Sequence, residues 1–229
     1  MEKVKYKIYN WLRRNKLMIY ANALSNFRYK LVKLFFKNPY DVIYNDTFYK
    51  DLIKIDNDTN TSKILGRAVM KFFAPRDVLD VGCGNGYYIN ELYKKYGVDV
   101  WGVENSKFGI KNSNIKYRIL NIDIFDIRTI NNKYDLSMCI EVAEHIPKKL
   151  SERLVQLLTM SSNTILFSTS PPGQGGTDHI NEKKIGYWIE LFKKYNFYYD
   201  EKVTEKFRKD LNGCVFWIRN NLFIFRSKK

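Results

Sequence analysis

Apolar side chains recur at helical spacing in two runs within residues 1–40. The first run keeps its apolar residues within one arc at about 100° per residue, whereas Arg13, Arg14 and Lys16 fall outside that arc. The apolar positions of this run are Val4, Ile8, Trp11, Leu12 and Ile19. Those of the second run are Leu24, Phe27, Leu31, Leu34 and Phe35. We expect two short amphipathic helices, with Pro39 stopping the second.

Beyond residue 60 the pattern alternates between helical spacing and short apolar runs. A polar cluster at 57–62 predicts a turn, followed by a helix at about 62–73. Further helices are predicted at 88–96, 150–160 and 184–195. The short apolar runs predict strands at 78–81, 98–103, 117–120, 136–140 and 164–168. Two last runs, 215–218 and 222–225, predict a closing hairpin around Asn220-Asn221.

Strands separated by helices are typical of an α/β fold, in which a mainly parallel sheet is covered by helices on both faces. A length of 229 residues suits one domain with an extension rather than two full domains. We therefore expect a basic helical extension at residues 1–60 and a single α/β domain at residues 61–229.

The net charge of +15 is concentrated near the N-terminus, because residues 1–40 hold ten Lys or Arg and one acid, Glu2. Such an arm can contact an anionic membrane, bind nucleic acid phosphates, or pack its apolar face on its own domain. All three interpretations stay open for residues 1–40. The 28 Lys and 11 Arg of the whole chain also fit an A/T-rich genome. Net charge alone therefore does not identify a nucleic acid partner.

The sequence shows no sign of export. No apolar run approaches the ~20 residues of a transmembrane segment, and no secretory signal is visible. Cys83, Cys139 and Cys214 are too scattered for a disulfide framework and lack zinc-finger spacing. We expect a cytoplasmic protein, located in the host cytoplasm if the gene is viral.

The predicted strand at 78–81 runs directly into Gly82-Cys83-Gly84-Asn85-Gly86. Glycines permit positive φ and let the backbone approach a ligand closely. The spacing differs from the G-x-G-x-x-G of dinucleotide sites. Asp80, just before the glycines, would repel a pyrophosphate and suits an ammonium group instead.

Two further acids follow predicted strands. Glu104 ends the second strand, where an acid typically binds ribose hydroxyls. Asp123 follows the third strand and is placed to reach an adenine amino group. An adenosine, a ribose diol and an amino acid ammonium, without a phosphate, describe S-adenosylmethionine.

These segments resemble the motifs of the class I S-adenosylmethionine-dependent methyltransferases. Residues 80–86 are similar to motif I, 100–104 to the second motif, 121–124 to the third and 134–141 to the strand-four motif. The resemblance covers about residues 60–229. It implies a Rossmann-like seven-stranded, mostly parallel sheet with one antiparallel strand, placed in the terminal hairpin. The cofactor-binding residues that it implies are Asp80, Gly82, Gly84, Gly86, Glu104, Asn105, Asp123, Ile124 and Cys139.

The only two histidines, His145 and His179, fall on loops that should border the acceptor pocket. His145 closes the segment Glu141-Val142-Ala143-Glu144-His145, just past the fourth strand, and His179 lies in the loop after the fifth. Glu141 and Glu144 are three residues apart, so we expect both carboxylates on one helical face with His145 adjacent.

Three roles are open for this group. His145, with Glu141 and Glu144 beside it, suits a general base for a hydroxyl acceptor. Alternatively, Glu141, Glu144, His145 and His179 bind Mg²⁺ or Mn²⁺, an arrangement similar to that of small-RNA terminal 2′-O-methyltransferases. Some quinone-pathway O-methyltransferases share the Glu-x-x-Glu-His segment. In metal-free relatives the same segment only caps and packs.

The loop at 173–181 and the aromatic segment at 187–192 are similar to methyltransferases of surface-glycan gene clusters and large DNA viruses. Trp188 and Phe192, four residues apart, are expected in the core. The resemblance implies an S-adenosylmethionine-dependent O-methyltransferase, and we expect a sugar or glycan hydroxyl as its acceptor. The alternatives are an RNA 2′-O-methyltransferase and a non-catalytic, cofactor-binding partner subunit.

Overall fold

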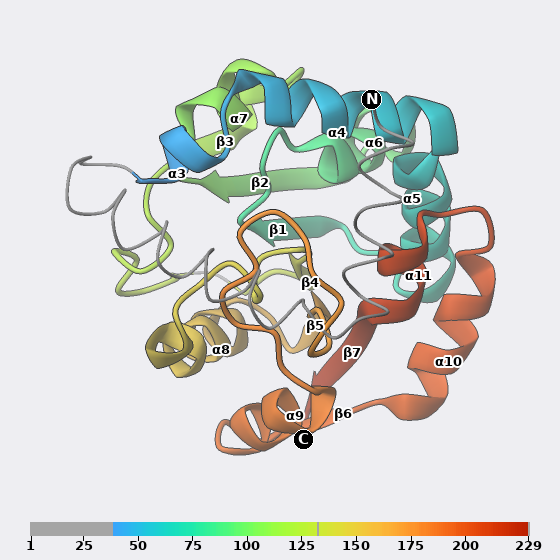
Figure 1. Cartoon of the computed structure of the whole chain (residues 1–229). Helices are drawn as coiled ribbons and strands as arrows, with labels where there is room; N and C mark the ends of the chain where they lie inside the picture. The colour runs from blue at the N-terminus through green and yellow to red at the C-terminus, as the bar shows by residue number, and fades with distance from the viewer. Residues whose placement is uncertain (1–38, 132, 229) are drawn as a thin grey trace.

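The computed structural model describes residues 39–131 and 133–228 (Figure 1). Its strands are β1 (Asp77–Val81), β2 (Asp99–Glu104), β3 (Ile119–Asn121), β4 (Leu136–Cys139), β5 (Thr164–Ser168), β6 (Phe197–Tyr199) and β7 (Leu222–Ser227). Its helices are α3 (Pro39–Ile43), α4 (Asp46–Thr59), α5 (Thr61–Phe72), α6 (Tyr87–Tyr96), α7 (Lys107–Lys111), α8 (Ser151–Ser161), α9 (Ile185–Lys193), α10 (Glu201–Asp210) and α11 (Phe216–Asn221). The helices expected within residues 1–38, and most of the arm expected to contact a partner, lie outside the described residues.

The strands form one seven-stranded sheet in the order β3-β2-β1-β4-β5-β7-β6. The first five strands in this order are mutually parallel, and β7 runs antiparallel to both β5 and β6. The expected Rossmann-like fold, with its mostly parallel sheet, is thereby confirmed.

The strands are apolar on both faces because helices cover the sheet on both sides. One core joins the sheet to α5, α6, α10 and α11, through residues such as Leu65, Ile89, Phe207 and Ile218. The other core joins it to α8 and α9, and there Trp188 and Phe192 are fully buried. Continuous apolar strands fit this two-sided burial.

The strand order reverses between β1 and β4, because β2 and β3 extend the sheet on one side and β4 and β5 on the other. Val78 of β1 lies in register with Val100 of β2 on one side and Leu136 of β4 on the other. In open α/β sheets, the crevice at the carboxyl ends of the strands beside such a reversal is where ligands bind.

The predicted terminal hairpin is wrong. Residues 216–221 form the short helix α11, and β7 pairs with β5 and β6 instead. Val215 N–H donates to Thr61 Oγ1 (3.1 Å), and Asn221 is engaged by Gln174 rather than forming a turn. Both partners are distant in sequence, so local pattern alone favoured the hairpin. Helix α10 was also missed, although Asp200 caps it by accepting from Val203 N–H (3.2 Å).

The region before residue 60 differs from expectation as well. The helix that Pro39 was expected to stop lies outside the described residues, and Pro39 itself is the first residue of α3; a first helical position suits proline, because its missing N–H is not needed there. The polar cluster at 57–62 is mostly helical, since only Asn60, with a φ of 53°, separates α4 from α5. Asp56 holds this junction by accepting from Ser62 N–H and Ser62 Oγ, both at 2.6 Å.

Within residues 39–131 and 133–228, no helix has the length and apolar content required to cross a membrane.

Candidate active site

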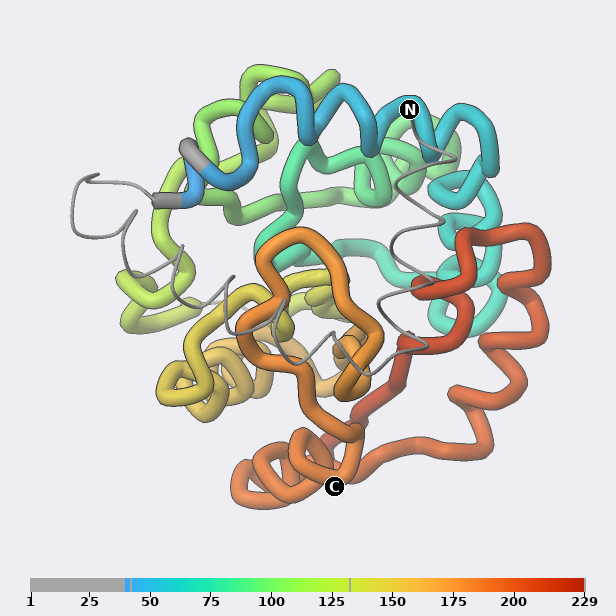
Figure 2. Tube along the Cα trace, in the orientation of Figure 1, coloured from blue at the N-terminus to red at the C-terminus, as the bar shows by residue number. Residues whose placement is uncertain are grey.

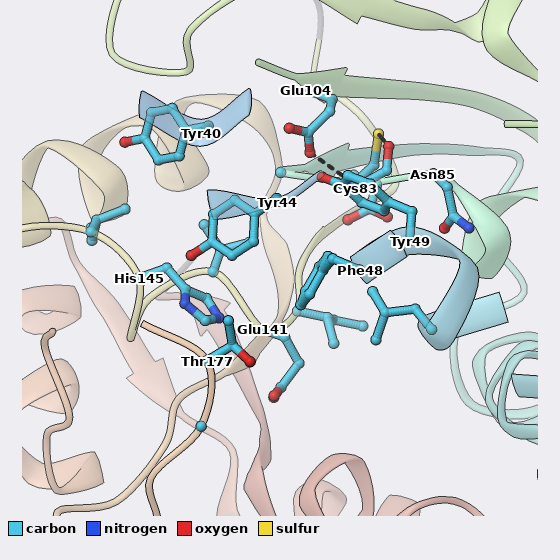
Figure 3. Close-up of a pocket in the computed structure, with 18 of the residues that line it drawn as sticks. Tyr40, Tyr44, Phe48, Tyr49, Cys83, Asn85, Glu104, Glu141, His145 and Thr177 are labelled. Carbon is cyan, nitrogen blue, oxygen red and sulfur yellow. Dashed lines mark hydrogen bonds between the residues drawn. The ribbon is translucent and has the colours of Figure 1, made fainter. Parts of the chain in front are cut away.

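A cavity of about 430 Å³ lies at the carboxyl ends of β1, β2, β4 and β5 (Figure 3). The loops after β1 and β4 and the loop after β5 form its floor and one wall, while α3, α4 and α11 supply aromatic side chains. Figure 3 shows Tyr44 and Phe48 between Glu104 at one end and His145 and Glu141 at the other. The cavity therefore joins the two sets of residues that the sequence singled out.

The loop after β1 is a tight backbone cradle. Gly82, Gly84 and Gly86 have φ values of 77°, 59° and 68°, a region in which only glycine is unstrained. Gly82 N–H and Cys83 N–H both donate to Val103 O, at 2.9 and 3.1 Å. A Cβ on Gly82 would lie 2.6 Å from Val142 Cγ2, so glycine is also required by the close approach of the loop after β4.

Glu104 ties β2 to this cradle. Its Oε2 accepts from Gly84 N–H and its Oε1 from Ser106 N–H, both at 2.7 Å. The backbone N–H of Asn105 bonds to the same carboxylate, and of its roughly four lone pairs about one can still accept from a ligand hydroxyl. Burial raises the pKa of Glu104, although the backbone N–H donors oppose that effect.

Asp80 is 2% exposed and lies beside Glu104. Burial, and then the charge of Glu104, raise the pKa of Asp80 to about 7. Asp80 is therefore only partly ionised at neutral pH, and a cation against it would favour the charged form. The position therefore suits an ammonium group.

The remaining predicted cofactor residues divide into two groups. Asn105, Asp123 and Ile124 line the cavity, and Asp123 accepts from Asn105 Nδ2 (3.0 Å) and Phe125 N–H (2.9 Å). Gly86 and Cys139 do not line it. Gly86 packs against Ile115 and Ile119, and Cys139 is fully buried in the core formed with α8 and α9.

The segment after β4 is a tight turn, and the expected helical face for Glu141 and Glu144 is absent from it. Glu141 has a φ of 59°, which no helical residue adopts. Ser168 holds it there, because Glu141 N–H donates to Ser168 Oγ (2.6 Å) and Ser168 Oγ donates to Glu141 Oε1 (3.0 Å). The strained backbone turns the Glu141 side chain toward the cavity, as Figure 3 shows.

Glu144, His145 and His179 form one cluster, with one potential ligand atom from each lying within 4.8 Å of the others. His145 and His179 line the cavity, whereas Glu144 is fully buried behind them. Ser170 Oγ donates to Glu144 Oε1 (3.1 Å), and Glu144 Oε2 has no hydrogen-bond partner. Burial and the neighbouring Glu141 raise the pKa of Glu144 well above its ordinary value.

The two imidazole rings meet edge to face, with centroids 4.9 Å apart. His145 Nδ1 lies 3.4 Å from Asp178 O, and His179 Nδ1 lies 3.2 Å from Glu182 Oε1. Burial, and then His179, lower the pKa of His145 to about 3. His145 is therefore a neutral imidazole throughout the physiological pH range.

Backbone hydrogen bonds bring the two histidines together. Ile180 N–H and Asn181 N–H both donate to Glu144 O (2.8 and 3.0 Å), and Asn181 Nδ2 donates to Ala143 O (3.1 Å). Figure 2 shows the resulting arrangement, with the orange loop after β5 beside the yellow segment after β4. The loops of two neighbouring strands thus form a single wall of the cavity.

Sequence reasoning missed the aromatic wall. Tyr44 lies between α3 and α4, with its ring centroid 5.5 Å from that of His145. Phe216 and Trp217 reach the cavity from α11. The spacing of Tyr40, Tyr44 and Phe48 at i, i+4 and i+8 was a usable signal, but nothing local connected it to residues a hundred positions away.

Comparisons with known proteins agree with the fold. Residues 78–160 match a family model described as a methyltransferase domain. The crystal structure of magnesium protoporphyrin IX methyltransferase from Synechocystis with bound S-adenosylmethionine is similar, with a TM-score of 0.57 and 15% identity over 82% of this chain and 89% of that chain. Residues 78–160 thus match a methyltransferase domain, and the chain shares its fold with a methyltransferase solved with bound S-adenosylmethionine.

Other relatives match over part of the chain or at low sequence identity. The ubiquinone biosynthesis O-methyltransferase of Bordetella avium is 30% identical over 103 residues, which cover 41% of this chain and 42% of that protein. The sugar N-methyltransferase from Streptoalloteichus has a TM-score of 0.59 with 14% identity, over 79% of this chain and 93% of its own. The chain spans less than half the length of the curated relatives that it matches first.

Proposed function

We propose that this chain transfers the methyl group of S-adenosylmethionine to a hydroxyl oxygen of a sugar or glycan acceptor. The observation that carries the proposal is that the glycine cradle and the Glu141–His145–His179 wall line one cavity. Methyl transfer requires donor and acceptor to be held in contact and in line, and such positioning supplies several kcal/mol of the rate enhancement.

The cofactor fits the residues at the β1 and β2 end. Asp80 would bind the ammonium group, and the remaining lone pair of Glu104 would accept from a ribose hydroxyl. Asp123, Asn105 and Ile124 would surround the adenine. Among the described residues that line the cavity there is no Lys or Arg, which suits a cationic sulfonium and disfavours a phosphate-bearing cofactor.

In the reaction, the acceptor oxygen attacks the methyl carbon, and the carbon–sulfur bond breaks with its electron pair staying on sulfur. The hydroxyl proton leaves to a basic group. His145 by itself is a poor match for that role, because an efficient general base has a pKa near the working pH, and burial lowers the pKa of His145 to about 3. Neutral imidazole is instead the form that binds metals.

The cluster fits a divalent cation. Glu144 Oε2 is a buried oxygen without a partner, and both histidines use Nδ1 in hydrogen bonds to oxygen, which leaves Nε2 available. Mixed carboxylate and imidazole donors suit Mg²⁺ or Mn²⁺. We infer that Glu144, His145 and His179 hold such an ion, whereas Glu141, the fourth ligand expected from the sequence, lies outside this group of ligand atoms and accepts from Ser168 Oγ. When bound, it would lower the pKa of the acceptor hydroxyl and orient that group.

The aromatic wall supports a ring-shaped acceptor. Tyr40 and Tyr44 stack with their ring centroids 6.3 Å apart on one side, and Phe216 and Trp217 line another part of the cavity. Apolar walls with a few convergent polar groups are typical of small-ligand sites. A sugar ring combines apolar faces with hydroxyl groups and therefore suits both kinds of surface.

Calorimetry with S-adenosylmethionine, with and without Mn²⁺, tests the cofactor and metal parts separately. We expect cofactor binding to the wild-type protein and to Glu144→Ala, and Mn²⁺ binding to the wild type only. An absence of cofactor binding would refute the methyltransferase proposal. Cofactor binding without Mn²⁺ binding would remove the metal and keep the rest.

Transfer of labelled methyl groups to oligosaccharides and to RNA oligomers identifies the acceptor class. We expect methylation of sugar hydroxyls with little dependence on salt. Methylation of RNA that falls steeply with salt would replace the glycan acceptor by the RNA 2′-hydroxyl. Cofactor binding without turnover on any acceptor, with or without Mn²⁺, would favour a non-catalytic partner subunit.

A further inference from the structure

Glu182 lies in the loop after β5, 8% exposed, and its carboxylate contacts two backbone N–H groups and one imidazole ring of that loop. Gly173 N–H donates to its Oε2 (2.7 Å) and Gly175 N–H to its Oε1 (2.5 Å). His179 Nδ1 lies 3.2 Å from the same Oε1. One buried carboxylate therefore connects the glycine turn of the loop to an imidazole ring of the cavity wall.

The direction of these bonds fixes the state of His179. Two backbone N–H groups point at Glu182, so its oxygens act as acceptors, and an ionised carboxylate has no proton to donate. With Glu182 ionised, His179 Nδ1 carries the proton and donates it. In a neutral imidazole this leaves the lone pair on Nε2, and Nε2 is the only ring nitrogen left to serve the cluster with Glu144 and His145.

We propose that Glu182 is a positioning residue for this site: it fixes the Nδ1–H tautomer of His179 and holds the glycine turn against the ring. The metal-binding part of this inference rests on the proposed function, whereas the tautomer does not. A carboxylate that accepts from the far nitrogen of a ligating histidine fixes ring orientation and raises the basicity of the ligating nitrogen.

The glycine turn shows how closely the loop is fitted. A Cβ on Gly176 would lie 2.3 Å from His179 Nε2 and 2.5 Å from Cε1, so the backbone of the loop lies directly against the ring. Glu182 sets the distance between loop and ring, since it binds Gly175 N–H and His179 Nδ1 through a single oxygen. The ring is held from both sides and cannot rotate without breaking these contacts.

Nitrogen-15 NMR of histidine-labelled protein at pH 8 tests the tautomer directly, because the chain contains only two histidines. A His145→Gln variant assigns the two sets of imidazole signals. We expect His179 to carry its proton on Nδ1 in the wild type, and the Nε2–H form to rise in Glu182→Gln, whose amide can donate to Nδ1. Glu190→Gln, an exposed acid on α9, is the matched control and should leave the tautomer unchanged.

A wild-type spectrum with the proton on His179 Nε2 would overturn the inference, and so would a Glu182→Gln spectrum identical to the wild type. The wild-type measurement decides the tautomer even if Glu182→Gln fails to fold. In that case Glu182→Asp, which keeps the charge but shortens the reach, replaces it.

Calorimetry of the same variants separates positioning from general stability. We expect Glu182→Gln to weaken Mn²⁺ binding about 10- to 100-fold. The affinity for S-adenosylmethionine should change less than about twofold, because the three bonds of Glu182 described above all stay within the loop after β5 and do not involve the cofactor cradle. Equal loss of both affinities would indicate a merely structural role. If the wild type binds no Mn²⁺, the proposed metal fails, while the NMR result for Glu182 still stands.

Discussion

Replacing Asp80 by Asn is expected to make the cofactor-free protein more stable at pH 8 while abolishing tight cofactor binding. Asp80 is 2% exposed, and burial followed by the charge of Glu104 raises its pKa from 3.8 to about 7. The folded protein therefore resists ionisation of this group, whereas the unfolded chain does not. An amide of nearly the same shape removes that conflict.

The magnitude follows from the two pKa values. Below pH 4 Asp80 is protonated in both states and costs nothing. Between pH 4 and pH 7 it is ionised only in the unfolded chain, so stability falls by about 1.4 kcal/mol for each pH unit. Above pH 7 the loss is complete, at up to about 4 kcal/mol, and the profile becomes flat.

Urea unfolding of the wild type and of Asp80→Asn at pH 5 and pH 8 measures this difference. The gap between the two proteins should widen by about 3 kcal/mol from pH 5 to pH 8. The exposed Asp126→Asn provides the control and should track the wild type. Parallel profiles for the wild type and Asp80→Asn would refute the reasoning, since they would mean that Asp80 is already ionised in the folded protein at pH 5.

Cofactor affinity should move in the opposite direction. An ammonium group favours the ionised form of Asp80, so S-adenosylmethionine should bind the wild type more tightly as pH rises through 7. Asp80→Asn should lose both the affinity and this pH dependence. A more stable protein that has lost its ligand would show that the buried acid is kept for binding.

Close contacts give three further expected outcomes. Gly82→Ala should lower the free energy of unfolding by about 2–4 kcal/mol, because Gly82 has a φ of 77° and a Cβ would lie 2.6 Å from Val142 Cγ2; unchanged urea unfolding would contradict this. Gly176→Ala should reduce turnover about tenfold or more through His179 while S-adenosylmethionine affinity, measured by calorimetry, stays the same; loss of both would place Gly176 in the cofactor site. Trp188→Ala should cost about 3–5 kcal/mol, because the ring is fully buried, and a thermal melt within 2 °C of the wild type would exclude a core position.

The parts of the fold that the sequence predicts are those set by local pattern. Strands β1, β2, β4 and β5 are short apolar runs because both faces of the sheet are covered, and the glycine cradle is visible because its glycines follow a strand at once. Helix α11 could not be predicted in the same way. Its start is held by Thr61 and its end by Gln174, and no pattern within 215–225 encodes either contact.

The candidate site divides along the same line. The positions of Asp80 and Glu104 follow from strand ends, and the meeting of His145 with His179 follows from the neighbouring strands β4 and β5. The backbone conformation of Glu141 could not be predicted from the sequence, because it depends on hydrogen bonds with Ser168 at the end of the neighbouring strand β5. The role of Glu182 could not be predicted either: its three partners lie within nine residues of it, but they meet its carboxylate only because the loop folds back on itself.

The matched methyltransferase region, residues 78–160, builds only part of the cavity. Tyr44, Phe216 and the loop at 171–183 come from outside it and form much of the surface that an acceptor would touch. Mutations in these flanking segments can alter acceptor preference while the cradle and Glu104 keep their geometry. Two proteins that share the matched region can therefore bind different acceptors, because the segments outside residues 78–160 can change while the matched part of the cavity stays the same.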